Sequence, residues 1–166
     1  MKILQIAVAV ALFGFLQHPD KANFAGRWNL DLKESKNLPR SFAQVESYVL
    51  DVRQTKDSLV VVIELTGGGQ SVKFPVTNYL FDSSESFRED TLRHSKRWTR
   101  SSWSADGQQL TVTSRVEQGM GEKKTEYTER DGWKMNDPDK FTIDVFQKYN
   151  IQDSTRTEQR IFHRAK

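Results

Sequence analysis

Apolar and polar side chains alternate with a period of two along most of the chain beyond residue 23. Val72, Phe74 and Val76 show this alternation within one short segment. A period of two places successive side chains on opposite faces of an extended strand, so it indicates β-strands that bury one face. No stretch has the 3.6-residue spacing of a long amphipathic helix. The chain is therefore expected to be all-β.

Turn signals divide this pattern into about nine strands. Gly67-Gly68-Gly69, Asp106-Gly107 and Asp137-Pro138-Asp139 each predict the reversal of a hairpin. Pro75 cannot donate to a strand ladder, so its segment is expected to be an edge strand or to contain a local break. The polar stretch 82–90 is expected to be a loop. The expected strands are 24–32, 46–54, 58–65, 70–80, 92–104, 108–117, 122–134, 141–149 and 154–164.

Antiparallel strands joined by short turns leave unpaired edges, and closing the sheet into a barrel removes them. We predict an antiparallel up-and-down β-barrel of about eight to ten strands, with a two-sheet β-sandwich as the alternative. Trp98 and Trp103 share one expected strand but have opposite parity. Both rings can face the interior only if a β-bulge lies between them.

The N-terminal segment differs from the rest of the chain. After Met1-Lys2, residues 3–16 are apolar apart from a glutamine and a glycine. This run has the length of a signal-peptide core and is shorter than the roughly 20 residues of a membrane-spanning helix. We expect a signal peptide at 1–22, cleaved near Ala22, and a barrel domain at 23–166 that is periplasmic or secreted. An uncleaved membrane anchor is the alternative.

Composition limits the core and the partners. Within residues 23–166, 46 of 144 residues are apolar, about 32%, whereas aromatic residues still make up about 11%. A thin barrel wall with few but large inward side chains fits this ratio. The absence of cysteine excludes disulfides, thiol nucleophiles and Cys-type zinc sites. Because the net charge is only +3, nucleic acid is not expected as a partner. We expect a monomer without a transmembrane segment in the mature chain.

The segment Asn23 to Leu30 resembles the opening strand of the lipocalin-like (calycin) superfamily, with Gly26 and Trp28 in its Gly-x-Trp signature. More closely, it is similar to small exported bacterial lipocalin-like domains of unassigned function. The resemblance implies a first strand that bends at Gly26 and a narrow barrel end filled by Trp28. It also implies that a basic residue of the last strand packs over this ring. Arg160 is the first candidate, and Arg156 is the next.

The resemblance, the alternation and the aromatic content together favour non-catalytic binding of a small hydrophobic or amphipathic molecule inside the barrel. Arg100, with Arg115 and Tyr127 on following strands, is a candidate partner for a ligand carboxylate. Glu64 lies within a β-branched run and is a second candidate polar group in the lumen. The full set of candidate lumen residues is Tyr48, Glu64, Phe74, Trp98, Arg100, Arg115 and Tyr127. For the basic residues from 93 to 100, a solvated outer face is the favoured interpretation, and the lumen role of Arg100 is the functional alternative.

Two other functions remain open. A barrel filled by its own side chains would instead be a structural or protein-interaction module of the cell envelope. An isomerase or cyclase would need a lumen cluster with perturbed titration around His94 or Glu64. His94 and His163 have no ligand-like spacing around them, and no Gly-x-Ser-x-Gly motif occurs. We therefore expect no metal, no cofactor and no catalytic residue.

Overall fold

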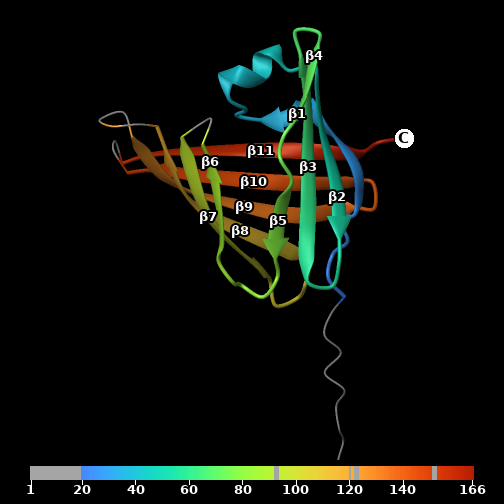
Figure 1. Cartoon of the computed structure of the whole chain (residues 1–166). Helices are drawn as coiled ribbons and strands as arrows, with labels where there is room; N and C mark the ends of the chain where they lie inside the picture. Colours follow the sequence, from blue (N-terminus) through green and yellow to red (C-terminus); the bar gives the residue numbers. More distant parts are fainter. Residues whose placement is uncertain (1–19, 92–93, 120, 122–123, 151–152) are drawn as a thin grey trace, which may run out of the picture.

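The computed structural model of the protein describes residues 20–91, 94–119, 121, 124–150 and 153–166. Most of the expected signal peptide, residues 1–19, lies outside the described residues. The described part forms strands and one short 3-10 helix (Figure 1). These elements are β1 (Gly26–Lys36), η1 (Arg40–Gln44), β2 (Ser47–Gln54), β3 (Ser58–Gly67), β4 (Gln70–Lys73), β5 (Thr77–Leu80), β6 (Ser86–Asp90), β7 (Ser95–Trp103), β8 (Gln109–Gln118), β9 (Thr125–Asp137), β10 (Lys140–Tyr149) and β11 (Ser154–Arg164).

All eleven strands belong to one antiparallel sheet with the order β4-β3-β2-β1-β11-β10-β9-β8-β7-β6, and β5 also pairs with β3. This up-and-down order confirms the predicted all-β class. The sheet curls so that β2, β3 and β5 run across β9, β10 and β11 (Figure 1). In the described residues no backbone ladder joins the β4 and β5 end of the sheet to β6. The barrel is therefore open along one seam.

The strand count exceeds the predicted eight to ten for two local reasons. The expected strand 70–80 is interrupted at Phe74-Pro75-Val76, so β4 and β5 pair with different parts of β3. This confirms the break expected at Pro75, which lacks the amide that a continuous ladder needs. The prediction of a loop over 82–90 is wrong for its second half, because Ser86–Asp90 pairs with β7 as a short edge strand. The polar composition of this stretch is the reason that the sequence predicted a loop.

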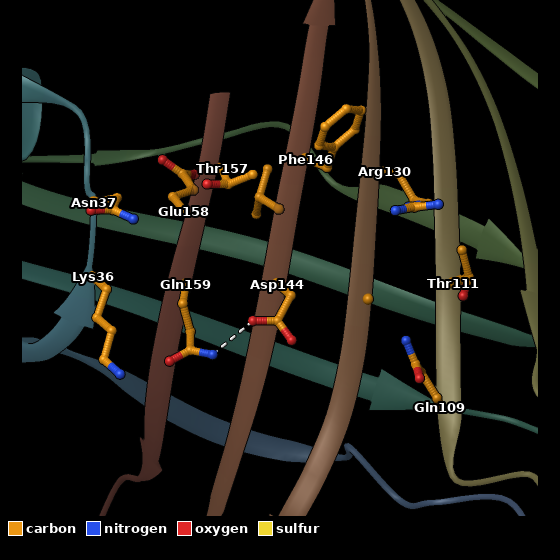
Figure 2. Close-up of a pocket in the computed structure, with 12 residues that line it drawn as sticks. Lys36, Asn37, Gln109, Thr111, Arg130, Asp144, Phe146, Thr157, Glu158 and Gln159 are labelled. Atoms are coloured by element: carbon orange, nitrogen blue, oxygen red, sulfur yellow. Dashed lines mark hydrogen bonds between the residues drawn. The ribbon is translucent and has the colours of Figure 1, made fainter. Parts of the chain in front are cut away.

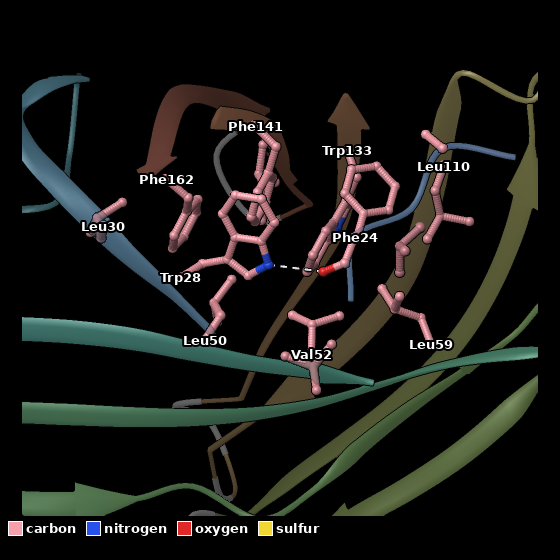
Figure 3. Packing of buried hydrophobic residues seen from close by; sticks show 14 of the residues in the cluster. Phe24, Trp28, Leu30, Leu50, Val52, Leu59, Leu110, Trp133, Phe141 and Phe162 are labelled. Atoms are coloured by element: carbon pink, nitrogen blue, oxygen red, sulfur yellow. Dashed lines mark hydrogen bonds between the residues drawn. The ribbon is translucent and has the colours of Figure 1, made fainter. Parts of the chain in front are cut away.

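Side chains fill one end of the barrel completely. Phe24, Trp28, Phe141 and Phe162 are fully buried there (Figure 3). The Phe141 ring stacks on Phe162 and on Trp133, with centroid distances of 4.8 and 5.5 Å. Trp28 meets Phe141 edge-on at 4.8 Å. Since neighbouring strands are antiparallel, the start of β1, the end of β9, the start of β10 and the end of β11 gather at this end.

Gly26 and Trp28 form a compact structural site with the last strand. The Trp28 indole N–H donates to the carbonyl of Phe24 at 2.9 Å (Figure 3). The guanidinium carbon of Arg164 lies 4.2 Å from the Trp28 ring centroid. A β-carbon on Gly26, whose φ is +138°, would overlap the Arg164 guanidinium. The cation over the tryptophan is therefore Arg164 and not Arg160, because the register pairs residue 164 with Trp28.

Candidate functional site

The inward faces of the strands change from apolar to charged toward the other end of the barrel. On β9, the inward side chains run from Trp133 through Asp131 to Glu129. On β11 they run from Phe162 through Arg160 to Glu158. The alternation that buries aromatic rings at one end thus buries ionisable groups at the other.

A cavity of about 320 Å³ lies among these charged groups. Its apolar wall comes from β3, from β5 and from the link between β4 and β5. Its polar wall comes from the inward faces of β6, β7, β9 and β11. The lining residues are Ile63, Phe74, Pro75, Thr77, Tyr79, Arg88, Asp90, Ser95, Arg97, Glu129, Asp131 and Arg160.

Glu129 is held as an anion by two partners. Arg97 Nη1 donates to its Oε1 at 2.7 Å, and Gln147 Nε2 donates to its Oε2 at 2.6 Å. Burial alone would raise the pKa of this carboxyl, but the Arg97 charge and the two hydrogen bonds keep it below the usual value. Both oxygens of Glu129 are thus engaged in the folded protein.

A second ion-pair group lies on β11. The Glu158 carboxylate is almost fully buried and accepts hydrogen bonds from Arg156 Nη2 at 3.1 Å and from Arg160 Nη2. The Arg160 guanidinium also lies 5.8 Å from the ring centroid of Phe42 in η1. Glu158 accepts from the terminal nitrogens of the two arginines, and Arg160 Nε is buried without a hydrogen-bond partner among the described residues.

Asp131 differs from both of these carboxylates. Burial, followed by the nearby Glu129 charge, raises the pKa of Asp131 to about 7. Its Oδ1 is buried and accepts no hydrogen bond within the described part of the chain. Arg160 Nε is likewise buried, and it donates no hydrogen bond to any described residue. Both Asp131 and Arg160 line the cavity. Within the described residues, the site therefore contains one carboxyl oxygen, of Asp131, and one N–H donor, of Arg160, that lack hydrogen-bond partners.

Two side-chain hydrogen bonds bridge the open seam of the barrel beside this cavity. Arg88 Nη1 on β6 donates to Thr77 Oγ1 on β5 at 3.2 Å. Ser101 Oγ on β7 donates to the carbonyl of Leu80 at the end of β5. The wall next to the cavity thus lacks the backbone ladder that the other strands share.

Three of the candidate lumen residues from the sequence face the interior. Phe74 lines the cavity. Tyr48 is buried in the core, where it stacks on Phe42 at a centroid distance of 5.8 Å. Tyr127 faces inward and packs against Tyr149 at 5.1 Å, without lining the cavity.

The other four candidates lie on the outer face. Glu64 pairs with Arg27 at 3.1 Å. Trp98 is covered by the Arg115 guanidinium at 3.7 Å. The Arg100 side chain is 65% exposed and pairs with Glu85 at 3.4 Å. The β7–β8 register is continuous from residue 95 to 103, so the conditional bulge between Trp98 and Trp103 does not form.

The sequence did not predict the charged residues of the lumen, although Arg160 was a candidate for the position over Trp28. These residues are Arg97, Glu129, Asp131, Glu158 and Arg160. Their odd or even position relative to an inward aromatic residue of the same strand would have identified them. Asp131 and Glu129 continue the even spacing of Trp133, and Arg97 has the parity of Trp103. Counting back from an aromatic residue at the filled end identifies the inward set on each strand.

A larger concavity of about 580 Å³ lies on the outside of β8 to β11 (Figure 2). Its floor is Gly132, which has no side chain, and its rim includes Arg130 and Thr111. Gln159 Nε2 donates to Asp144 Oδ1 across it at 2.8 Å. This concavity lies on the outer face of the sheet, whereas the lumen cavity holds buried polar atoms without a hydrogen-bond partner among the described residues, so the lumen cavity is the stronger candidate site.

One surface cluster has metal-ligating residue types. Asp31, Glu34 and His163 bring one potential ligand atom each within 4.8 Å of the others. Lys140 Nζ already donates to Glu34 at 2.7 Å, and the amides of Lys33 and Glu34 bind Asp31 Oδ1. Lys140 neutralises Glu34, and two backbone amides already occupy Asp31 Oδ1, so the three residues form a hydrogen-bonded ion-pair group.

No family model and no curated protein matches the chain. Among solved structures, one similar chain is described as "REP1-NXSQ fatty acid transporter". The two share 15% identity with a TM-score of 0.49, over 86% of this chain and 96% of that one. A likeness this distant does not bear on function. Among the described residues, no helix is both long and apolar enough to cross a bilayer.

Proposed function

We propose that this protein is a lipocalin-like carrier that binds a small amphipathic molecule in the lumen cavity without catalysing a reaction. The observation that carries the proposal is the cavity itself, with an apolar wall opposite a charged one. Its volume of about 320 Å³ lies at the lower end of the range of ligand pockets, roughly 300–1,000 Å³. An amphipathic guest would place its apolar part against Ile63 and Tyr79 and its polar part toward β9 and β11.

The same cavity argues against the alternative of a barrel filled by its own side chains. Aromatic packing fills only the end around Trp28 and Phe141. At the other end, Arg97 and Glu129 satisfy each other and leave space between β5 and β9. A purely structural module gains nothing from burying these charges, since ion pairs removed from water rarely add stability over apolar packing.

Acid–base catalysis is not favoured by the Glu129 and Asp131 pair. Two carboxyls with oppositely shifted pKa values are typical of general acid–base sites. Here, however, both Glu129 oxygens are occupied by Arg97 and Gln147. Proton abstraction by Glu129 would therefore have to compete with the hydrogen bonds that already hold each of its oxygens. His94 and Glu64, the centres expected for an isomerase, lie outside the lumen cavity.

Displacement binding tests the proposal directly. Nile red, a neutral apolar fluorophore, is titrated against the purified protein and then displaced by unlabelled amphiphiles. Ser95→Phe places a ring in the cavity, whereas Ser102→Phe places the same ring on the outer face of the same strand. We expect Ser95→Phe to weaken Nile red binding at least tenfold and Ser102→Phe to leave it unchanged. Failure of the wild type to bind any apolar probe would overturn the proposal.

Export and the monomeric state are part of the same proposal. The apolar run at residues 3–16 supports a signal peptide ending near Ala22. N-terminal sequencing of the protein from its native host, with sedimentation analysis of the product, tests both. A mature chain that still begins at Met1, or a stable dimer, would contradict them.

A further inference from the structure

Nearly all of the charged groups around Asp131 already have partners. Arg97 pairs with Glu129, and Glu129 also accepts from Gln147. Arg160 pairs with Glu158 through its terminal nitrogen. A ligand that bound to any of these would have to break an existing ion pair, which costs the desolvation of the group left behind.

Among the described residues that line the cavity, the buried side-chain atoms without a hydrogen-bond partner are Asp131 Oδ1 and Arg160 Nε. Asp131 on β9 lies opposite Val145 on β10, and Val145 lies opposite Glu158 on β11. Arg160 is the next inward residue of β11, so the two side chains reach the cavity from strands separated by one strand. A buried polar atom without a hydrogen-bond partner destabilises the folded protein. A guest that satisfied both would recover this cost.

The two atoms make different demands on a guest. Arg160 Nε is a permanent donor and needs an acceptor. Asp131 accepts when ionised, and when protonated it also donates. A carboxylate head satisfies Arg160 but meets repulsion from ionised Asp131 and from Glu129. An ammonium head satisfies ionised Asp131 but offers no acceptor to Arg160. A hydroxyl or carboxamide provides both a donor and an acceptor.

We infer that the head group recognised by this cavity is neutral and bears both a hydrogen-bond donor and an acceptor, as in an aliphatic alcohol or a primary amide, and that it binds between Asp131 and Arg160. The inference rests on the proposed function and specifies its ligand class.

The protonation of Asp131 separates the three kinds of head group by pH. The groups that set it are Glu129 on the same strand, Arg97 on β7, and Glu158 and Arg160 on β11. Tyr48 and Tyr79 face the same carboxyl, and burial raises the pKa of both phenols, so they stay neutral in this range. A carboxylate should bind better as the pH falls below 7, and an ammonium should bind better as it rises. A neutral head should change little.

The test compares 1-decanol, decylamine and decanoic acid, which share one alkyl chain, as competitors of Nile red at pH 5.5, 7.0 and 8.5. We expect 1-decanol to bind tightest at pH 7.0 and to vary less than threefold over the series. At pH 8.5 decanoate should be about tenfold weaker than 1-decanol, the equivalent of one hydrogen bond. Equal affinities, tighter binding of either charged analogue at pH 7.0, or failure of all three would overturn the inference.

Two substitutions of Asp131 locate the effect. Asp131→Asn keeps a donor and an acceptor, so it should retain 1-decanol affinity within threefold and remove the pH dependence of decanoate. Asp131→Leu removes both and should lose about tenfold for 1-decanol but not for Nile red. Asp144→Leu, on the outer face of β10, is the matched control and should change neither.

The outcomes distinguish the two levels of the argument. If Nile red does not bind to the wild type, the proposed function fails. If Nile red binds but the head-group series shows decanoate or decylamine preferred, the carrier function stands and the inferred ligand class fails. The wild-type series decides this even if Asp131→Leu does not fold.

Discussion

Glu129 and Asp131 point into one cavity from the same face of β9, yet only Glu129 is held by hydrogen bonds. Arg97 and Gln147 engage both Glu129 oxygens, whereas Asp131 Oδ1 has no partner in the described residues. Two carboxyls a short distance apart in a partly dry site do not readily ionise together. The arginine on β7 therefore decides which of the two carries the charge.

The first prediction concerns stability against pH. The pKa of Asp131 is raised to about 7 in the folded protein, against about 3.9 when unfolded. Between these values the unfolded state ionises and the folded state does not, so stability falls as pH rises through this window. The unfolding free energy of the wild type should fall between pH 5 and pH 8. We expect this fall to be about 2 kcal/mol smaller in Asp131→Asn. Urea denaturation at both pH values measures it.

Glu129 does not obscure this measurement. Its pKa is lowered in the folded protein, so its stabilising contribution is present above the unfolded value of about 4.3 and is lost only below it. An identical pH slope in the wild type and in Asp131→Asn would show that Asp131 ionises normally.

A second prediction contrasts two arginines on β7. Arg97 faces the lumen and pairs with Glu129, whereas Arg100 faces outward and is 65% exposed. Arg97→Met leaves the Glu129 carboxylate, which is 13% exposed, without its cationic partner and should cost about 3 kcal/mol of unfolding free energy. Arg100→Met should cost less than about 0.5 kcal/mol. Chemical denaturation at pH 7 compares them, and equal effects would contradict the assigned faces.

A third prediction concerns the close approach of Gly26 and Arg164. Gly26→Ala imposes both a φ that only glycine adopts readily and an overlap with the guanidinium, and should cost about 2 kcal/mol. In an Arg164→Met background the overlap is relieved, so the same substitution should cost about 1 kcal/mol less. Gly68→Ala, at a φ of +58° with open space around its β-carbon, reports the cost of a positive φ without any overlap. If the effects of Gly26→Ala and Arg164→Met on the unfolding free energy were strictly additive, the contact between residue 26 and Arg164 would be ruled out.

A fourth prediction concerns the seam. The ends of the sheet at β4, β5 and β6 lack a second backbone partner in the described residues, whereas β10 is paired on both sides. Backbone amides of β6 should therefore exchange with deuterium much faster than those of β10. Ser101→Ala removes the hydrogen bond to the Leu80 carbonyl and should speed exchange in β5 without affecting β10. Equal protection of β6 and β10 would mean that the seam is closed in solution.

The alternation of side chains along a strand explains which residues of the site the sequence could predict. The alternation around Trp98 is clear, but the sequence contains no local signal for which of its two sets faces inward. Trp98 and Arg100 are packed outside because Trp103 and Thr99 occupy the inner face of β7. An aromatic ring covered by an arginine, as Trp98 is by Arg115, satisfies its apolar surface without entering the core.

The sequence by itself determined the all-β class, the hairpin turns and the irregularity of the strand around Pro75. These features follow from side-chain period and from backbone chemistry, which act over a few residues. Only the tertiary structure decided that Arg164 covers Trp28, that the sheet stays open beside β6, and that Asp131 and Arg160 share one cavity. The physical reason is that strand register and sheet curvature arise from contacts between segments far apart in the chain, and a shift of one residue exchanges the two faces of a strand.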